Sequence, residues 1–179
     1  MFLLERIDHT IKKVKSQTAN ALTLLNLSFG ILAIIFSIHE HYSISLTLIF
    51  LAALSDRFDG MVARRFNIVS EFGKQLDSLC DLISFGIAPS LLIYHSILSE
   101  SITIGSVAVV IYIVCASIRL ARFNVQENTS YFIGIPITLA GILLTFSYLF
   151  ANAISSVAYL YIMVILGILM ISPFKLKKI

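Results

Sequence analysis

The stretch DRFDGMVARRFNIVSEFGKQLDSLCDLI, residues 56–83, lies between apolar segments and carries four aspartates. These are Asp56, Asp59, Asp77 and Asp81. Ionised carboxylates at membrane depth are costly and rare, so they mark a functional site. Four converging carboxylates repel one another strongly unless a divalent cation lies between them. The stretch therefore predicts a metal site at the end of membrane helices.

The composition favours an integral membrane protein of the all-α class. Hydrophobic residues make up 58% of the 179 residues and charged residues only 13%, with a mean hydropathy of +0.94. These values exclude an ordinary soluble domain, so we expect a lipid bilayer as partner and no nucleic acid. Six apolar stretches predict six transmembrane helices, at residues 19–37, 42–54, 82–98, 102–117, 133–150 and 154–171.

The lengths of these stretches place the aspartates. A helix needs about 20 residues to cross the hydrocarbon, and the second stretch is too short to do so alone. We expect it to continue through the first aspartate pair to about Ala63. We expect the third helix to begin near Gly73 and to carry the second pair in its first turns. Both pairs then lie at one membrane surface.

The basic residues predict the orientation of the chain. In a six-helix arrangement all thirteen Lys and Arg residues fall on one side, and the opposite loops around 39–41, 99–101 and 151–153 hold none. Because Lys and Arg in short loops prefer the cytoplasm, we expect both termini and the aspartates on that side. Residues 38–41, IHEH, do not resemble a signal-peptide cleavage site, so we expect the first stretch to remain in a multi-pass protein of the cell membrane.

Residues 1–17 predict an amphipathic helix that lies in the cytoplasmic interface. Its apolar positions recur every three or four residues and are Leu4, Ile7, Ile11 and Val14. The alternative is a solvated helix end that serves only as a topology signal. Residues 18–179 then form one six-helix domain, since open strands are excluded from lipid. Cys80 and Cys115 lie in predicted spans, and we interpret them as small packing residues.

The helical period gathers the four aspartates on two similar faces. At about 100° per residue, one face combines Asp56 and Asp59 with the small residues Gly60 and Ala63, and Arg64 lies beside it. Asp77 and Asp81 share a second face with Gly73, Ser84 and Ala88.

Carboxylates are hard oxygen ligands that suit Mg²⁺, Mn²⁺ or Ca²⁺. The small residues leave room for a ligand near the backbone, and Arg64 can meet phosphate oxygens. Metal, phosphate and a spare carboxylate are the parts of a phosphoryl-transfer site. The alternative is that the aspartates cap helix ends or pair with Arg57, Arg64 and Arg65.

The spacing Asp56-x-x-Asp59-Gly60-x-x-Ala63-Arg64, eight residues, Gly73-x-x-x-Asp77-x-x-x-Asp81 resembles the signature of the CDP-alcohol phosphatidyltransferases at every position. That family has six transmembrane helices, is usually homodimeric, and transfers a phosphatidyl group from a CDP-linked lipid to an alcohol with release of CMP. The resemblance implies a two-metal site for Mg²⁺ or Mn²⁺ on the four aspartates, with Asp81 also the candidate catalytic base. The residues that it places along the cytidine diphosphate are Asp56, Asp59, Gly60, Ala63, Arg64 and Gly73.

Further stretches resemble the membrane-embedded branch of this family that makes phosphatidylserine. They are NALTLLN at 20–26, SFGIAP at 84–89, RLARFN at 119–124 and FIGIP at 132–136. Ala19 departs from the proline that many relatives have there. The resemblance implies CDP-diacylglycerol and L-serine as substrates. Candidates for binding the acceptor are Arg119, Arg122, Asn124, Lys74 and Asn26, with the two arginines suited to the serine carboxylate.

Three alternatives remain at this point. An acceptor such as glycerol phosphate or inositol phosphate carries a phosphate that Lys74, Arg119 and Arg122 could also bind. A small cation transporter would use intramembrane carboxylates, but it needs them near the midplane with access from both faces. An inactive lipid-binding scaffold is disfavoured because all four aspartates are present.

Overall fold

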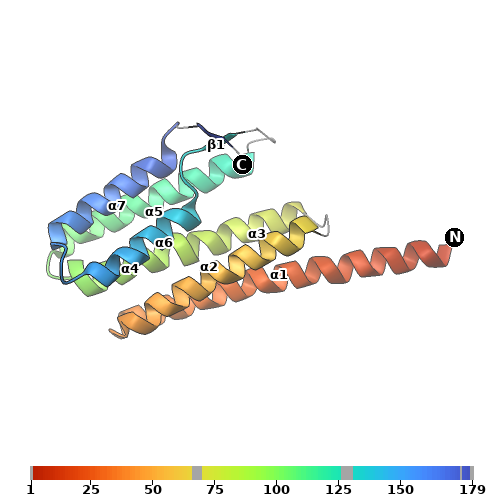
Figure 1. Ribbon diagram of the computed structural model, residues 1–179, viewed down its shortest axis with the longest axis horizontal. Coiled ribbons are helices and arrows are strands. Elements are labelled where there is room, and N and C mark those ends of the chain that lie inside the picture. The colour runs from red at the N-terminus through yellow and green to blue at the C-terminus, as the bar shows by residue number, and fades with distance from the viewer. Residues whose placement is uncertain (1, 66–69, 126–130, 174, 178–179) are drawn as a thin grey trace.

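A computed structural model describes residues 2–65, 70–125, 131–173 and 175–177. Within these ranges the chain forms seven α-helices, two π-helical segments, one 3-10 turn and two short strands. The helices lie roughly along one long axis, and the successive rods of the bundle alternate in direction (Figure 1). The prediction of an all-α architecture is confirmed, with one small two-stranded sheet added to it.

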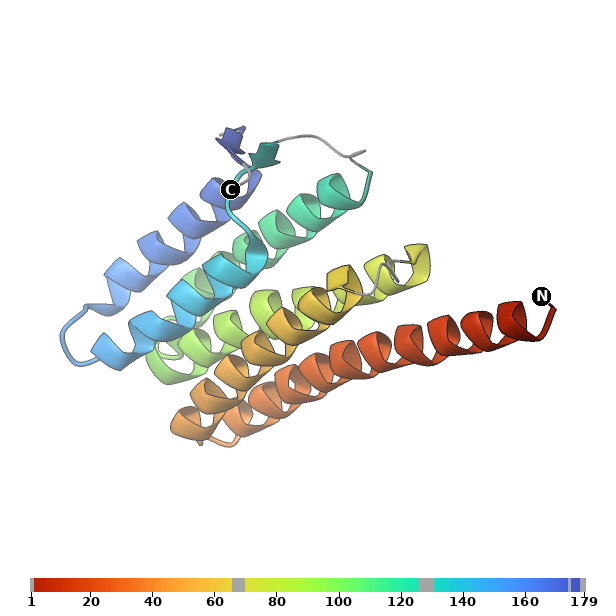
Figure 2. The same cartoon turned by 45° about the vertical axis from the view of Figure 1, so that its right-hand side comes forward.

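The first two helices form an antiparallel pair. Helix α1 spans Phe2–Ile38 and α2 spans Tyr42–Arg65, joined by a short turn in which Glu40 has a φ of 64°. The N-terminal part of α1 projects beyond the other helices (Figures 1 and 2). From Phe2 onward α1 is continuous, so the segment predicted to lie in the interface runs without a break into the first apolar stretch.

The third membrane helix is a composite rod. It consists of α3 (Glu71–Asp81), the π segment η1 (Leu82–Ile87), α4 (Ala88–Ile93) and the π segment η2 (Tyr94–Leu98). Ser70 caps its start, because the Ser70 Oγ accepts the Gly73 N–H at 3.0 Å. The predicted extensions are thus confirmed: α2 continues past the first aspartate pair, and α3 begins just before Gly73.

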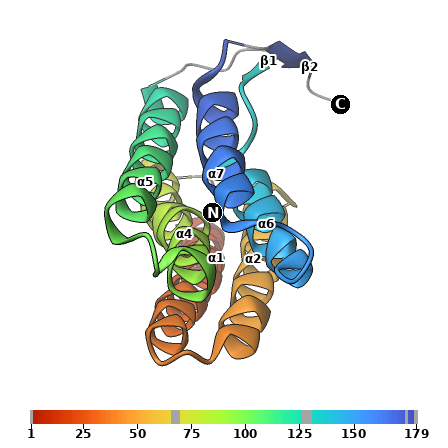
Figure 3. The same cartoon turned by 90° about the vertical axis from the view of Figure 1, so that its left-hand side faces the viewer.

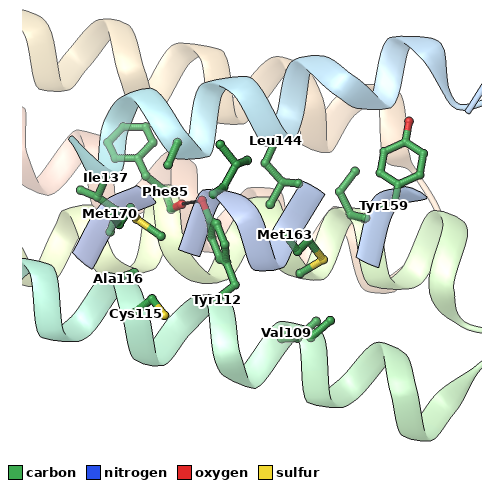
Figure 4. Close-up of a cluster of buried hydrophobic side chains, with 14 of the residues drawn as sticks. Phe85, Val109, Tyr112, Cys115, Ala116, Ile137, Leu144, Tyr159, Met163 and Met170 are labelled. Atoms are coloured by element: carbon green, nitrogen blue, oxygen red, sulfur yellow. Dashed lines mark hydrogen bonds between the residues drawn. The ribbon is translucent and has the colours of Figure 1, made fainter. Parts of the chain in front are cut away.

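Pro89 removes one backbone hydrogen bond next to the π segment η1. Pro89 has no N–H and cannot donate to the Phe85 carbonyl one turn earlier. The Tyr112 hydroxyl from α5 (Ile102–Val125) donates to that carbonyl instead, at 3.3 Å. Figure 4 shows this bond inside the cluster of buried apolar side chains. The substitute bond fastens α5 to the rod that carries Asp77 and Asp81.

The remaining elements complete the bundle. Helix α6 (Ile137–Ser147) leads into the turn η3 (Tyr148–Phe150), and α7 (Ser156–Ile171) packs beside α5 and α6 (Figure 3). Strand β1 (Tyr131–Ile133) pairs antiparallel with β2 (Lys175–Lys177).

The fifth apolar stretch begins as a helix later than residue 133, where the sequence placed it. Pro136 is the extended N-cap of α6, with φ −60° and ψ 144°. Gly134 precedes it with a φ of 71°, and a Cβ there would overlap the Met170 carbonyl. The chain therefore makes a tight turn before α6 and leaves Ile133 in β1.

Three of the described segments are long and apolar enough to cross a membrane: Asn20–Ile38, Glu71–Leu98 and Ile102–Val125. Ile137–Phe150 and α7 are shorter apolar helices. Many large apolar side chains on the outside of the bundle are exposed, as a lipid-facing surface requires. Cys80 and Cys115 are both buried and free, as predicted for packing residues.

Candidate active site

Three of the four aspartates converge at the end of the bundle where α2 ends and α3 begins. Asp56, Asp59 and Asp77 each offer a carboxylate oxygen, and these oxygens all lie within 4.8 Å of one another. Asp59 is buried, at 4% exposure, and the other two are half-buried. The antiparallel hairpin of α2 and α3 thus brings together residues that the helical period had placed on separate faces.

The surroundings of Asp59 include Thr23, which is not among the predicted site residues. The Thr23 side chain from α1 hydrogen-bonds to the Asp59 carboxylate, and the Gly60 backbone amide does so as well. The Asp59 Oδ2 has no hydrogen-bond partner among the described residues. Thr23 lies in the stretch NALTLLN and on the same helix face as Asn20 and Asn26, and that spacing was the available signal.

Asp81 lies one turn beyond Asp77, at the last residue of α3 before the π segment. It is 8% exposed, its carboxyl group interacts with that of Asp56, and its Oδ1 has no partner among the described residues. The Arg119 guanidinium from α5 interacts with it electrostatically. Asp81 therefore borders the triad, with one oxygen left for another ligand.

The residues expected along a nucleotide lie around the same end of the bundle. Gly60 is one turn beyond Asp56 on α2. Gly73 packs closely on α1, since a Cβ there would lie 3.4 Å from the Asn20 Oδ1. Ala63 and Arg64 belong to the last turns of α2, and their side chains lie outside the described part of the chain.

The two candidate arginines on α5 have different neighbours. Arg119 is half-buried and interacts electrostatically with Asp81, and its Cζ lies 5.3 Å from the centre of the Phe123 ring. Arg122 is exposed and donates to the Ile171 carbonyl at 3.0 Å, at the end of α7. The structure brings Arg119 toward the aspartates and places Arg122 on the α7 side of the bundle.

Lys74 and Asn124 link the start of α3 to the end of α5 near the site. The Lys74 Nζ donates to the Asn124 carbonyl at 3.0 Å. The Asn124 side chain accepts from the Ser78 hydroxyl and donates to the Gln75 side-chain oxygen Oε1, both at 3.0 Å. These bonds tie the end of α5 to α3 and so support the position of Arg119.

Asn26 on α1 is fully buried, and neither atom of its side-chain amide has a hydrogen-bond partner among the described residues. Its backbone carbonyl accepts from the Ser84 hydroxyl at 3.1 Å. One turn later Gly30 also packs on Ser84, and a Cβ at Gly30 would overlap that residue. α1 and η1 are thus in close contact beside Asn26.

A model of the CDP-alcohol phosphatidyltransferase family matches residues 16–171, which is most of the chain. The chain belongs to this family. The resemblance carried by the spaced aspartates is confirmed, and the CDP-alcohol phosphatidyltransferase fold accounts for the apolar bundle as that of a membrane enzyme.

Curated relatives are similar over most of this phosphatidyltransferase. A CDP-diacylglycerol–serine O-phosphatidyltransferase of Methanocaldococcus jannaschii is 39% identical over 157 residues, covering 87% of this chain and 71% of the relative. The Bacillus subtilis protein of the same name is 38% identical over 131 residues, covering 71% of this chain and 74% of its own. An archaetidylserine synthase of Methanothermobacter thermautotrophicus is 36% identical over 176 residues, covering 94% and 73%.

The carboxylate set of this phosphatidyltransferase fits a hard divalent cation. Its donors are all oxygens from Asp56, Asp59 and Asp77, at a spacing close to that of ligands around one such ion. The unpartnered Oδ2 of the buried Asp59 points to the same conclusion, because a buried carboxylate oxygen is otherwise costly to leave unpaired.

Proposed function

We propose that this enzyme transfers the phosphatidyl group of CDP-diacylglycerol to the hydroxyl of L-serine, with release of CMP. The observation that carries the proposal is the carboxylate triad of Asp56, Asp59 and Asp77 with Asp81 beside it, in a chain similar to enzymes named for that reaction. A membrane transferase of this family acts on a CDP-linked lipid, and serine is the acceptor common to the names of these relatives.

The triad is the proposed metal site, for Mg²⁺ or Mn²⁺ and with room for a pair of ions when Asp81 takes part. When bound, such ions stabilise charge on the phosphoryl oxygens and the departing CMP. Asp56, Asp59 and Asp77 would hold such ions and so help to orient the pyrophosphate. Gly60 and Gly73 let the nucleotide approach the backbone, and Arg64 is the proposed partner of a phosphate oxygen.

Asp81 is the proposed base. Its free Oδ1 can accept the proton of the serine hydroxyl as that oxygen attacks the lipid-side phosphorus. The O–P bond to serine forms while the bond from phosphorus to the CMP oxygen breaks, and CMP leaves with its electron pair. Since a carboxylate is a weak base, much of the rate comes from positioning and from charge stabilisation.

The acceptor can be tested directly. Purified protein with Mg²⁺ and either CDP-diacylglycerol or a CDP-linked isoprenoid ether lipid is given serine, glycerol phosphate or inositol phosphate, and CMP release is measured. We expect release with serine and little with the two phosphates. Release only with a phosphorylated acceptor would contradict the proposal, and comparison of the two lipids identifies the donor.

Arg119 is the proposed partner of the serine carboxylate. Replacing it by Ala removes a charge-assisted bond of about 1.5–3 kcal/mol, so the KM for serine should rise roughly ten- to a hundredfold. The KM for CDP-diacylglycerol should change little. Lysine should rescue only partly because it lacks the planar fork. Arg122→Ala is the control variant. It should raise the serine KM less, because Arg122 donates to the Ile171 carbonyl. Equal rises of the serine KM in the two variants would contradict this assignment.

We further propose that six helices cross the cell membrane, with both termini and the site in the cytoplasm and residues 1–17 along the interface. The positions of the basic residues support this orientation. The carboxylates lie near one end of the bundle, whereas a transporter needs access from both faces. The homodimer implied by the family resemblance stays a prediction.

Cysteine labelling tests the orientation. In a variant without Cys80 and Cys115, we expect a single cysteine at Glu100 to react with an impermeant maleimide added to intact cells. Cysteines at Ser16 and Lys177 should react only after permeabilisation, because the membrane shields them. The reverse pattern would place the site away from cytosolic serine.

A further inference from the structure

Two sets of contacts give the depth of Asn26 in the bundle. Two residues of α1 contact α2: Thr23 bonds to Asp59, and Ala33 shares a buried cluster with Ile49. Because α1 and α2 are antiparallel, these two contacts place Asn26 at the level of Asp56. The buried amide therefore lies about one helical turn deeper than the contact between Thr23 and Asp59.

The contacts between α1 and the composite rod give the same level for Asn26. Gly73 lies against Asn20, Gly30 packs on Ser84, and the Ser37 hydroxyl donates to the Leu91 carbonyl at 3.3 Å. In this parallel register Asn26 lies opposite the turn that holds Asp81. Two independent registers thus put the Asn26 amide level with both Asp56 and Asp81, the two carboxylates farthest from the end of the bundle.

Unpartnered groups gather at this level. The Asn26 Nδ2 and Oδ1 and the Asp81 Oδ1 are all buried without a hydrogen-bond partner among the described residues. A buried amide that lacks both its partners is unfavourable, so a group from outside the chain is expected to bind there. The neutral amide lies at the level of two carboxylates, and a cationic group is attracted to that level of the bundle whereas a phosphate is repelled.

We propose that the Asn26 amide binds the ammonium group of the acceptor amino acid. The Oδ1 accepts a hydrogen bond from that group beside Asp81, and the Nδ2 donates to an oxygen of the same amino acid. The inference rests on the proposed function and extends it: Arg119, which comes from α5, faces the acceptor carboxylate, while Asn26, which comes from α1, faces its ammonium group. An acceptor such as glycerol phosphate has no group that fits this position.

Two half-analogues of serine separate these roles. Ethanolamine has the ammonium group without the carboxylate, and 3-hydroxypropanoate has the carboxylate without the ammonium group. Both are assayed as inhibitors of serine-dependent CMP release by the full-length enzyme. For Asn26→Leu we expect the serine KM and the ethanolamine Ki to rise about tenfold or more, with the 3-hydroxypropanoate Ki unchanged. Arg119→Ala should raise the serine KM and the 3-hydroxypropanoate Ki and leave the ethanolamine Ki unchanged. Asn26→Asp keeps an oxygen for the ammonium group and should retain ethanolamine binding.

Stability gives a readout apart from activity. Leucine at position 26 removes a buried unpartnered amide, so we expect Asn26→Leu without ligands to melt in detergent no lower than wild type. Ser45→Ala is the matched control, since the Ser45 hydroxyl is also buried without a described partner but lies at the far end of α2. It should leave both inhibition constants unchanged.

Four results would overturn the proposal. They are unchanged ethanolamine inhibition in Asn26→Leu, an equal rise for both analogues with a lowered melting temperature, a rise in the KM for CDP-diacylglycerol instead of that for serine, and a higher Mg²⁺ requirement, which would make Asn26 a metal ligand. Failure of wild-type enzyme to use serine would instead contradict the proposed function, so the two failures are distinguishable.

Discussion

Protein stripped of divalent cations by a chelator should release no CMP above background from CDP-diacylglycerol and serine. The oxygens of Asp56, Asp59 and Asp77 lie within 4.8 Å of one another, and a bound cation in that position offsets both their repulsion and the charge on the pyrophosphate. Stabilisation of several kcal/mol is lost with the metal, so turnover should fall by about a thousandfold or more. Adding Mg²⁺ or Mn²⁺ should restore it.

A variant of the triad makes this experiment specific. Asp59→Asn keeps the shape of the side chain and removes one charged ligand, so the Mg²⁺ concentration for half-maximal activity should rise. Calorimetric titration with CDP-diacylglycerol in the presence of metal should show weaker binding. Full turnover in a preparation free of metal, as measured by elemental analysis, would be incompatible with the proposed site.

Asp81→Asn should lower turnover by about 10²–10⁴-fold, the usual contribution of a positioned general base. The amide keeps the size of the carboxylate but cannot accept the serine proton. Binding of CDP-diacylglycerol and metal should change far less than in Asp59→Asn, because Asp56, Asp59 and Asp77 remain. The measurements are kcat from CMP release and affinity from calorimetry on the same preparations. Wild-type turnover in Asp81→Asn would assign the base to another group.

Much of the site was predictable because its determinants lie along the chain. Spacings of three and four residues put each aspartate pair on one helix face, and the membrane thickness forced both helices to extend through them. The same reasoning could not separate Arg119 from Arg122. Their different partners, Asp81 and Ile171, depend on how α5 packs against its neighbours.

Other features depend on contacts between helices and had no local signal. Thr23 reaches Asp59 only because of the α1–α2 register. The hydroxyl that bonds to the Phe85 carbonyl in the π segment comes from another helix. The start of α6 was placed too early because hydropathy alone does not register the turn made by Gly134 and Pro136.

The bond between Tyr112 and the Phe85 carbonyl links the apolar interior to substrate choice. Tyr112 and Arg119 lie seven residues apart on α5, two turns along nearly the same face and about 10 Å apart. The phenol therefore ties the helix that carries Arg119 to the rod that carries Asp81. If Arg119 holds the acceptor as proposed, a substitution at Tyr112 should change acceptor selectivity although the substrate is not expected to touch that residue.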